Sequence, residues 1–357
     1  MSAAQDISLR PYQRQPHVES PFIRAPESPT KAFLEIFVAA MLPLLAGMVF
    51  FGYRVVYLAG LAMLTCVLTE HLYYRATRQL ALASRAHAML TGLLLALTLP
   101  AFVPWYVPVV GAVIATILGK AVFGGVGHFI WQPALVGRLA VLVLFSATMT
   151  SPNTKHPDAY PDAWPIVTQQ NMLMGDITLY RYQSDYTTWK AYRTFSGIDA
   201  ILVTRPEATL APLTRGQPAY SSLATFRRDR PSLYPAVFNK LPSIGDVIYG
   251  STPGAIGETS AAAIVVAGLF LIWRRFVKWQ LPVAIILAAG LTAAAAPVQL
   301  IGTGATVSQY GWPVLREGLD VGLLYVGYQI LTGGLFLVAF FLATETTTRP
   351  VAAGGQV

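Results

Sequence analysis

Long apolar runs alternate with short polar segments along most of the chain, and one long polar stretch interrupts the alternation. Runs of this kind predict transmembrane helices, because about 20 apolar residues are needed to cross the hydrocarbon layer of a membrane. Several runs are shorter than that, so the pattern leaves their ends loosely defined. The predicted helices cover residues 32–53, 55–74, 86–100, 105–123, 134–149, 260–273, 281–297 and 321–342.

This pattern predicts an all-α polytopic membrane protein with about eight transmembrane helices. Lysine and arginine concentrate in the short polar segments of one side, which indicates that both termini are cytoplasmic. The long polar stretch, rich in Tyr and Trp, then lies outside the cytoplasm. The predicted parts are a cytoplasmic segment at 1–31, a first repeat of five helices at 32–149, an extracytoplasmic loop at 150–257, a second repeat of three helices at 258–344 and a cytoplasmic tail at 345–357.

Two of the runs resemble one another. Residues 90–100 read LTGLLLALTLP and residues 331–344 read LTGGLFLVAFFLAT. In the predicted topology these two segments cross the membrane in opposite directions. Such a relation is typical of an inverted repeat, an architecture that places functional sites near the middle of the membrane. A chance likeness between two leucine-rich segments is the alternative.

Composition agrees with a membrane protein. Of the 357 residues 54% are hydrophobic and 12% are charged, whereas soluble domains carry about 25% charged residues. The formal net charge of +8 follows from the basic residues at the ends of the runs, which favours membrane topology over nucleic-acid binding as its cause. A single cysteine, Cys66, excludes an internal disulfide and any zinc or iron–sulfur site built from this chain's cysteines alone. The five histidines show no metal-ligand spacing.

A glycine-rich stretch at residues 119–141 interrupts the apolar pattern. Non-helical backbone at membrane depth is tolerated where it is buried in protein or lines a cavity, so this break in the helical pattern suggests a binding site. An ordinary loop between two helices is the simpler interpretation. Lys120 and Arg138 flank the break and could neutralise a bound phosphate, but extension of their side chains to the cytoplasmic surface is the favoured interpretation.

Charged residues inside the predicted helices are few. Glu70 lies near the end of the second run beside His71, where we expect it at the water boundary. No predicted helix carries a paired-charge relay, which disfavours a substrate transporter.

Several motifs together resemble a known family. They are TGLLLALTLP at 91–100, GGVGHFIWQPALVG at 124–137, LPS at 241–243, PGAIGETSA at 253–261 and TGG with AFFLAT between 332 and 344. The chain resembles the membrane subunit shared by two complexes, namely the D component of Rnf-type ferredoxin:NAD oxidoreductases and the B component of sodium-translocating NADH:quinone oxidoreductases. The resemblance covers most of the chain except the middle of the long loop.

The resemblance implies ten spans in two inverted five-helix repeats, in the inner membrane of a bacterium. It also implies an FMN joined through its phosphate to a threonine outside the cytoplasm, in a complex whose electron transfer is coupled to sodium or proton movement. Thr209, in RPEATLAPL, is the candidate for that threonine. Other candidate cofactor residues are Gly124 and Gly125 of the glycine stretch and Gly257, Glu258 and Thr259, which precede a predicted helix whose N-terminus could receive a phosphate. The segment Glu258-Thr259-Ser260 reads first as a helix N-terminal cap region.

The chain departs from the family pattern at several positions. Pro206 and Glu207 stand where the family carries Ser-Gly before Ala-Thr, and Phe129 and Gln132 replace two asparagines. The sequence ends soon after Leu342, ahead of two further spans of the family. Two functions therefore stay open. One is an FMN-bearing subunit that relays electrons at the outer face; the other is a flavin-free structural subunit of a larger assembly. In both cases we expect other membrane subunits to cover the face that those two spans would bury.

Overall fold

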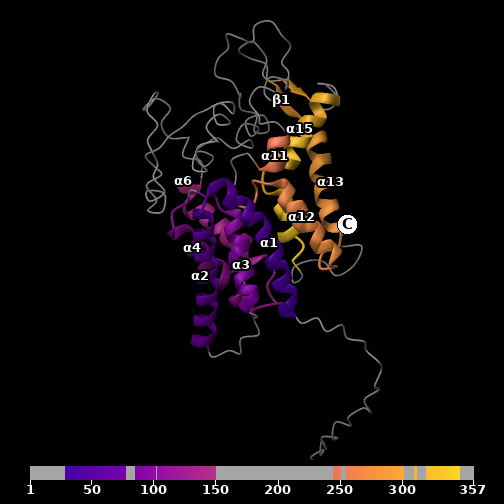
Figure 1. Ribbon diagram of the computed structural model, residues 1–357. Coiled ribbons are helices and arrows are strands. Elements are labelled where there is room, and N and C mark those ends of the chain that lie inside the picture. Colours follow the sequence, from indigo (N-terminus) through magenta and orange to yellow (C-terminus); the bar gives the residue numbers. More distant parts are fainter. Residues whose placement is uncertain are drawn as a thin grey trace, which may run out of the picture.

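The computed structural model describes residues 29–77, 85–101, 103–149, 244–250, 255–300, 309–311 and 319–345, and the predicted loop at 150–257 falls largely outside them. The first set of helices comprises α1 (Pro29–Phe51), α2 (Arg54–Thr77), α3 (Arg85–Thr98), α4 (Tyr106–Ile117), the 3-10 turn η1 (Ala121–Phe123), α5 (Pro133–Leu144) and α6 (Ser146–Met149). The second set comprises α11 (Ile244–Tyr249), α12 (Ala261–Trp273), α13 (Gln280–Ala295), α15 (Leu319–Leu331), α16 (Leu335–Leu337) and the π-helical turn η5 (Val338–Leu342). Figure 1 shows the two sets side by side.

Helices lie in all eight predicted ranges. Three of them are long and apolar enough to cross a membrane, and a fourth candidate is the bent pair formed by α15 with α16 and η5. The chain is therefore a multi-pass membrane protein. The remaining apolar helices, α3, α5, α12 and α13, are shorter than a full span, so their crossing stays a prediction.

Two elements differ from the predicted pattern. The run at 321–342 is not one helix, because the chain turns by 58° between α15 and α16. Gly333 lies in this break with φ +82°, a conformation that side-chain-bearing residues rarely adopt. The second difference is a short antiparallel ribbon, in which β1 (Val298–Leu300) pairs with β2 (Gln309–Gly311), in a chain predicted to be all-α.

Helix α3 lies at the centre of the first set and packs against α1, α2, α4 and α5. Its residues from Leu90 to Thr98 are all buried. Close approach of α2 is possible because Gly92 has no side chain; a Cβ there would lie 2.6 Å from the Met63 Cα. Small residues at such crossings are typical of helices packed in a membrane.

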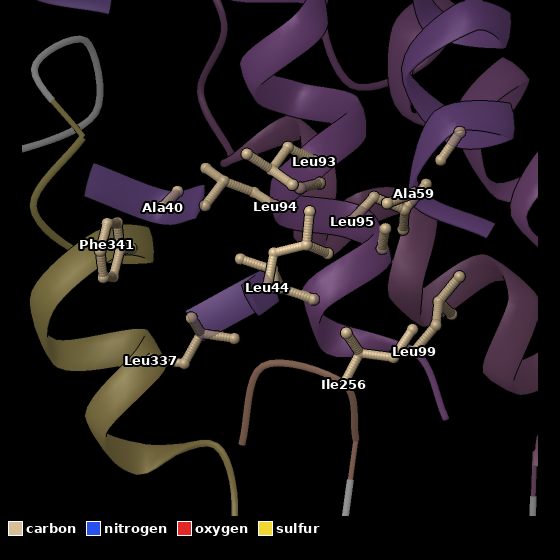
Figure 2. Close-up of a cluster of buried hydrophobic side chains, with 14 of the residues drawn as sticks. Ala40, Leu44, Ala59, Leu93, Leu94, Leu95, Leu99, Ile256, Leu337 and Phe341 are labelled. Atoms are coloured by element: carbon tan, nitrogen blue, oxygen red, sulfur yellow. The ribbon is translucent and has the colours of Figure 1, made fainter. Parts of the chain in front are cut away.

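Helix α1 connects the two sets. In Figure 2, Ala40 and Leu44 of α1 lie between Leu93 and Leu94 of α3 and the segment that carries Leu337 and Phe341. The same helix packs against α12. One apolar core therefore extends across both sets, and α3 meets the second set at each of its two ends.

Candidate functional site

The carboxyl end of α3 is joined to the second set through the backbone. The Ile256 N–H donates to the Leu99 carbonyl at 3.0 Å, and the Gly257 N–H donates to the Leu97 carbonyl at 2.7 Å. Pro100 and Ala255 form a β-bridge beside them. We call this pairing of 97–100 with 255–257 the backbone joint. Its hydrogen bonds satisfy backbone carbonyl groups that have no partner within the helix at its carboxyl end.

Gly257 makes the backbone joint possible. A Cβ at this position would lie 2.7 Å from the Leu97 Cβ and 3.0 Å from the Leu97 carbonyl oxygen. Contacts that short are not tolerated between packed atoms, so the position requires glycine. The structure therefore gives Gly257 a packing contact, whereas its predicted role toward a cofactor stays a prediction.

The residue after Gly257 faces the break in the second set. The Glu258 carboxylate accepts a hydrogen bond from the Ala255 N–H at 3.2 Å, and it lies against Gly334, where a Cβ would be 2.7 Å from the Glu258 Oε1. Thr259 is buried. These residues bring the backbone joint, the start of α12 and the bend before α16 into one place.

The start of α12 has a side-chain cap. Ser260 Oγ accepts from the Ala263 N–H at 3.2 Å, which confirms the helix-cap interpretation of this segment. A phosphate here would compete with that cap and would approach the Glu258 carboxylate, which repels it. The start of α12 therefore does not fit an FMN phosphate.

The glycine stretch forms a tight turn after η1. Gly124 and Gly125 have φ of +107° and +97°, so both use backbone conformations that favour glycine. A Cβ at Gly125 would lie 2.5 Å from the Tyr74 Oη, which places this turn directly on α2. The chain then enters α5 with Gln132 as its cap, because the Gln132 Oε1 accepts from the Leu135 N–H at 2.8 Å.

A buried ion pair lies next to this turn. The Lys120 Nζ is 2.9 Å from the Glu70 Oε1 and 2.7 Å from the Glu70 Oε2, and the two side chains are 2% and 9% exposed. The expected positions of both residues were wrong. Lys120 does not extend to the surface and Glu70 does not lie at the water boundary, because each satisfies the other inside the helix packing.

A second buried pair joins the amino end of α3 to the second set. The His87 Nε2 lies 2.8 Å from the Glu345 Oε1, and the side chains are 0% and 3% exposed. Phe33 of α1 covers the imidazole edge-on, with 4.8 Å between ring centroids, and Phe129 lies beyond it at 5.6 Å. Sequence reasoning did not single out His87 or Glu345.

The two pairs lie near one another, because Glu345 is within electrostatic range of Lys120. We call Glu70, His87, Lys120 and Glu345 the buried charge cluster. His87 and Leu97 are ten positions apart on α3, which corresponds to about 15 Å along the helix axis at 1.5 Å per residue. The candidate residues Gly124 and Gly125 thus lie near the buried charge cluster, whereas Gly257, Glu258 and Thr259 lie at the backbone joint. Thr209 is outside the described residues.

The two ion pairs were not anticipated from the sequence, and the prediction that no helix carries a paired-charge relay stays a prediction. Each pair joins a helix residue, Glu70 of α2 or His87 of α3, to a residue just outside a helix, at separations of 50 and 258 positions along the chain. The usable signal was the presence of ionisable residues next to apolar runs, since a charge at membrane depth needs a partner.

Arg54 is a further buried charge, at the start of α2. Its Nε donates to the Ala101 carbonyl and its Nη2 to the Val103 carbonyl, both at 2.7 Å. The side chain thereby binds two backbone carbonyls of the segment that follows α3. The hydropathy pattern assigns this residue to a loop between two helices, so its burial is not apparent from the sequence.

Comparison with known proteins places this architecture in a family. The profile of the NQR2, RnfD, RnfE family matches residues 17–357. The chain is 27% identical to the D component of the proton-translocating ferredoxin:NAD(+) oxidoreductase complex of Clostridium ljungdahlii, over 95% of this chain and 80% of that protein. It is 27% identical to the D component of the ion-translocating oxidoreductase complex of Halorhodospira halophila, over 95% of this chain and 81% of that one. It is 28% identical to the D component of the ion-translocating oxidoreductase complex of Stutzerimonas stutzeri, over 89% of this chain and 76% of that protein.

Proposed function

The chain belongs to the NQR2, RnfD, RnfE family, and from this premise we propose that it is the membrane subunit of an ion-translocating oxidoreductase complex. The observation that carries the proposal is the family match over nearly the whole chain, together with relatives named as D components of such complexes. Buried ionisable side chains among membrane helices support it, because such groups are retained where ions or protons are handled. Its partners in this proposal are the other membrane subunits of the complex.

The proposed arrangement is eight spans related by an inverted repeat, in the bacterial inner membrane, with cytoplasmic termini and residues 150–257 outside. Cysteine labelling on intact cells tests it, in a Cys66→Ala background. Ser221→Cys should react with a membrane-impermeant thiol reagent, and Ala353→Cys should react only after the cells are opened. Labelling of Ala353→Cys on intact cells would contradict the proposed topology.

The redox form of the proposal is that FMN is attached through its phosphate to Thr209 and relays electrons at the outer face. The family resemblance of the chain supports this assignment. When bound, the flavin would supply one- and two-electron transfer. Thr209→Val should abolish covalently bound flavin without changing the fold, since the ester needs the hydroxyl, and Thr209→Ser should retain part of it. In-gel flavin fluorescence and mass spectrometry of the loop peptide measure both.

A flavin-free structural subunit is the second candidate. The observation that favours it is the pair Pro206 and Glu207 directly before Ala208-Thr209, because proline alters the local backbone and the carboxylate repels a phosphate. Pro206→Ser with Glu207→Gly should raise flavin content if occupancy is limited by these two residues. Absence of the adduct in both the natural and the changed chain, with partner subunits still bound after gentle solubilisation, would favour the structural role.

A further inference from the structure

The turn that joins α12 to α13 is fixed to the protein through its backbone. The Phe276 N–H donates to the Leu271 carbonyl at 3.0 Å, and the Arg275 N–H donates to the Ile272 carbonyl at 2.9 Å. These two bonds form a Schellman motif, in which the second residue after the helix has left-handed backbone. Val277 is buried in the apolar core and Phe276 packs against the same core, so the inner side of the turn is anchored.

Arg275 occupies the position of this motif that glycine usually takes. Its φ is +63°, and among the described residues it is the only one with a side chain that has a positive φ. Left-handed backbone brings a Cβ close to the following carbonyl oxygen, a cost that glycine avoids. The Arg275 side chain is exposed, so the packing of the turn does not require it. Backbone strain of this kind concentrates at functional positions, which makes the charge of Arg275 the feature to explain.

The outer side of the turn carries basic groups between two tryptophans. Arg275 and Lys278 are both exposed. Trp273 ends α12 and Trp279 precedes α13, and they are 76% and 58% exposed. Tryptophan at the ends of apolar helices is typical of the boundary between lipid and water. The two basic side chains therefore lie at the level of the lipid headgroups.

Acidic side chains are scarce around this turn. The helices α1, α12 and α13 carry one acidic residue among them, Glu35 of α1. Its carboxylate accepts two hydrogen bonds from Arg274, at 2.8 and 2.6 Å, so it is directed at that residue of the turn. Lys31 lies one helical turn before Glu35 and adds a further basic group to the same end of the helices. This surface therefore suits an anion.

We propose that residues Trp273–Trp279, which we call the basic turn, bind the phosphate of an anionic phospholipid. Arg275 and Lys278 contact the phosphate, and the two tryptophans lie against the glycerol and the upper acyl chains. A guanidinium offers paired N–H donors to phosphate oxygens, and an ammonium group adds a compact charge. Basic residues directly beside a membrane helix attract anionic lipids. The proposal requires only that the chain lies in a membrane, and it is independent of flavin binding and electron transfer.

Thermal unfolding of the full chain in detergent, with lipid added in steps, tests the proposal. A ligand that binds the folded protein raises its unfolding midpoint. Half of the maximal rise should need at least about tenfold less phosphatidylglycerol than phosphatidylcholine with the same acyl chains. Free glycerol 3-phosphate should give no rise, because the tryptophans then have no lipid to contact. Equal responses to the two lipids, or an equal response to free glycerol 3-phosphate, would overturn the proposal.

Arg275→Gly separates lipid binding from folding. Without lipid this variant should be at least as stable as the natural chain, because glycine adopts a positive φ without strain. The phosphatidylglycerol concentration for half of the maximal rise should increase about fivefold, and Lys278→Gln should have a similar effect. Arg75→Gln, at the exposed end of α2 in the first set, removes one charge elsewhere and is the control.

Three results would overturn the assignment of the site to Arg275. One is a loss of stability in Arg275→Gly without lipid, which would give the side chain a structural role. Another is an equal weakening of lipid binding in Arg75→Gln, which would mean that surface charge in general attracts the lipid. The third is an unchanged lipid response in Arg275→Gly together with loss of partner subunits from the gently solubilised complex, which would make the basic turn a protein contact.

Discussion

The two ends of α3 contact the second helix set by different means. At the carboxyl end the contact is made by backbone hydrogen bonds from Ile256 and Gly257, and its specificity comes from a missing side chain. At the amino end the contact is made by two buried side chains, His87 and Glu345, whose Nε2 and Oε1 atoms are 2.8 Å apart. The difference teaches that the first contact depends on shape and tolerates no added volume, whereas the second depends on the pairing of two buried polar side chains.

The largest expected effect is at the charged end. Lys120→Met leaves Glu70 buried without its partner, and removing one member of a buried ion pair costs about 3–5 kcal/mol. Thermal unfolding of the detergent-solubilised protein should show a large loss of stability. The matched control is Arg274→Met, which removes the partner of Glu35 in an ion pair whose side chains are 46% and 29% exposed and should change unfolding little. Equal losses in the two variants would remove the distinction between buried and exposed pairs.

The backbone end should respond to added volume. Gly257→Ala places a methyl group 2.7 Å from the Leu97 Cβ, and overpacking of this kind costs about 1–3 kcal/mol. The same unfolding measurement applies. Gly60→Ala is the control, because no atom lies within 4 Å of a Cβ at that helical position. A Gly257→Ala protein as stable as the natural one would mean that the backbone joint is looser than its geometry indicates.

A smaller effect is expected next to the backbone joint. Ser260→Ala removes the cap of α12 and should cost about 1 kcal/mol. Thr65→Ala is a suitable comparison, because the Thr65 hydroxyl bonds to the Leu61 carbonyl within the same helix and its loss should not destabilise the protein. Stability is again followed by thermal unfolding, and a Ser260→Ala protein no less stable than Thr65→Ala would argue against a capping role.

The smallest expected effect is the energetic coupling between substitutions at the two ends of α3. Because they are about 15 Å apart along α3, the effects of Lys120→Met and Gly257→Ala should add to within about 0.5 kcal/mol. Lys120→Met and Glu345→Gln, both in the buried charge cluster, should deviate from additivity by more than that. Double-mutant cycles on unfolding free energies measure both. Strong coupling between Lys120 and Gly257 would mean that the two ends of α3 act as one unit.

Hydropathy predicted the positions of the helices because burial in lipid or in other helices requires continuous apolar runs, and each predicted range contains a helix. It did not predict the break at Gly333, since glycine is common in membrane helices and does not by itself mark a bend. The cap at Ser260 was predictable because capping depends on neighbouring residues.

Long-range contacts could not be predicted in the same way. His87 and Glu345 are 258 positions apart, and nothing in the local sequence of either one specifies the other. Arg54 was assigned to a loop because it lies between two predicted helices, and its burial depends on the carbonyls of Ala101 and Val103, which lie 47 and 49 positions away in another predicted loop. Charge placement in this protein follows from tertiary packing, which a single sequence does not encode position by position.

The backbone joint has a consequence for how the protein is made. Leu99 and Leu97 receive hydrogen bonds from residues that the ribosome adds about 160 positions later, which corresponds to roughly 10–30 s of synthesis. Unpaired carbonyl groups cost several kcal/mol in hydrocarbon. The end of α3 therefore has to stay hydrated, or be shielded by the insertion machinery, until the segment before α12 emerges. Assembly of the first five helices is thus completed by the second half of the chain.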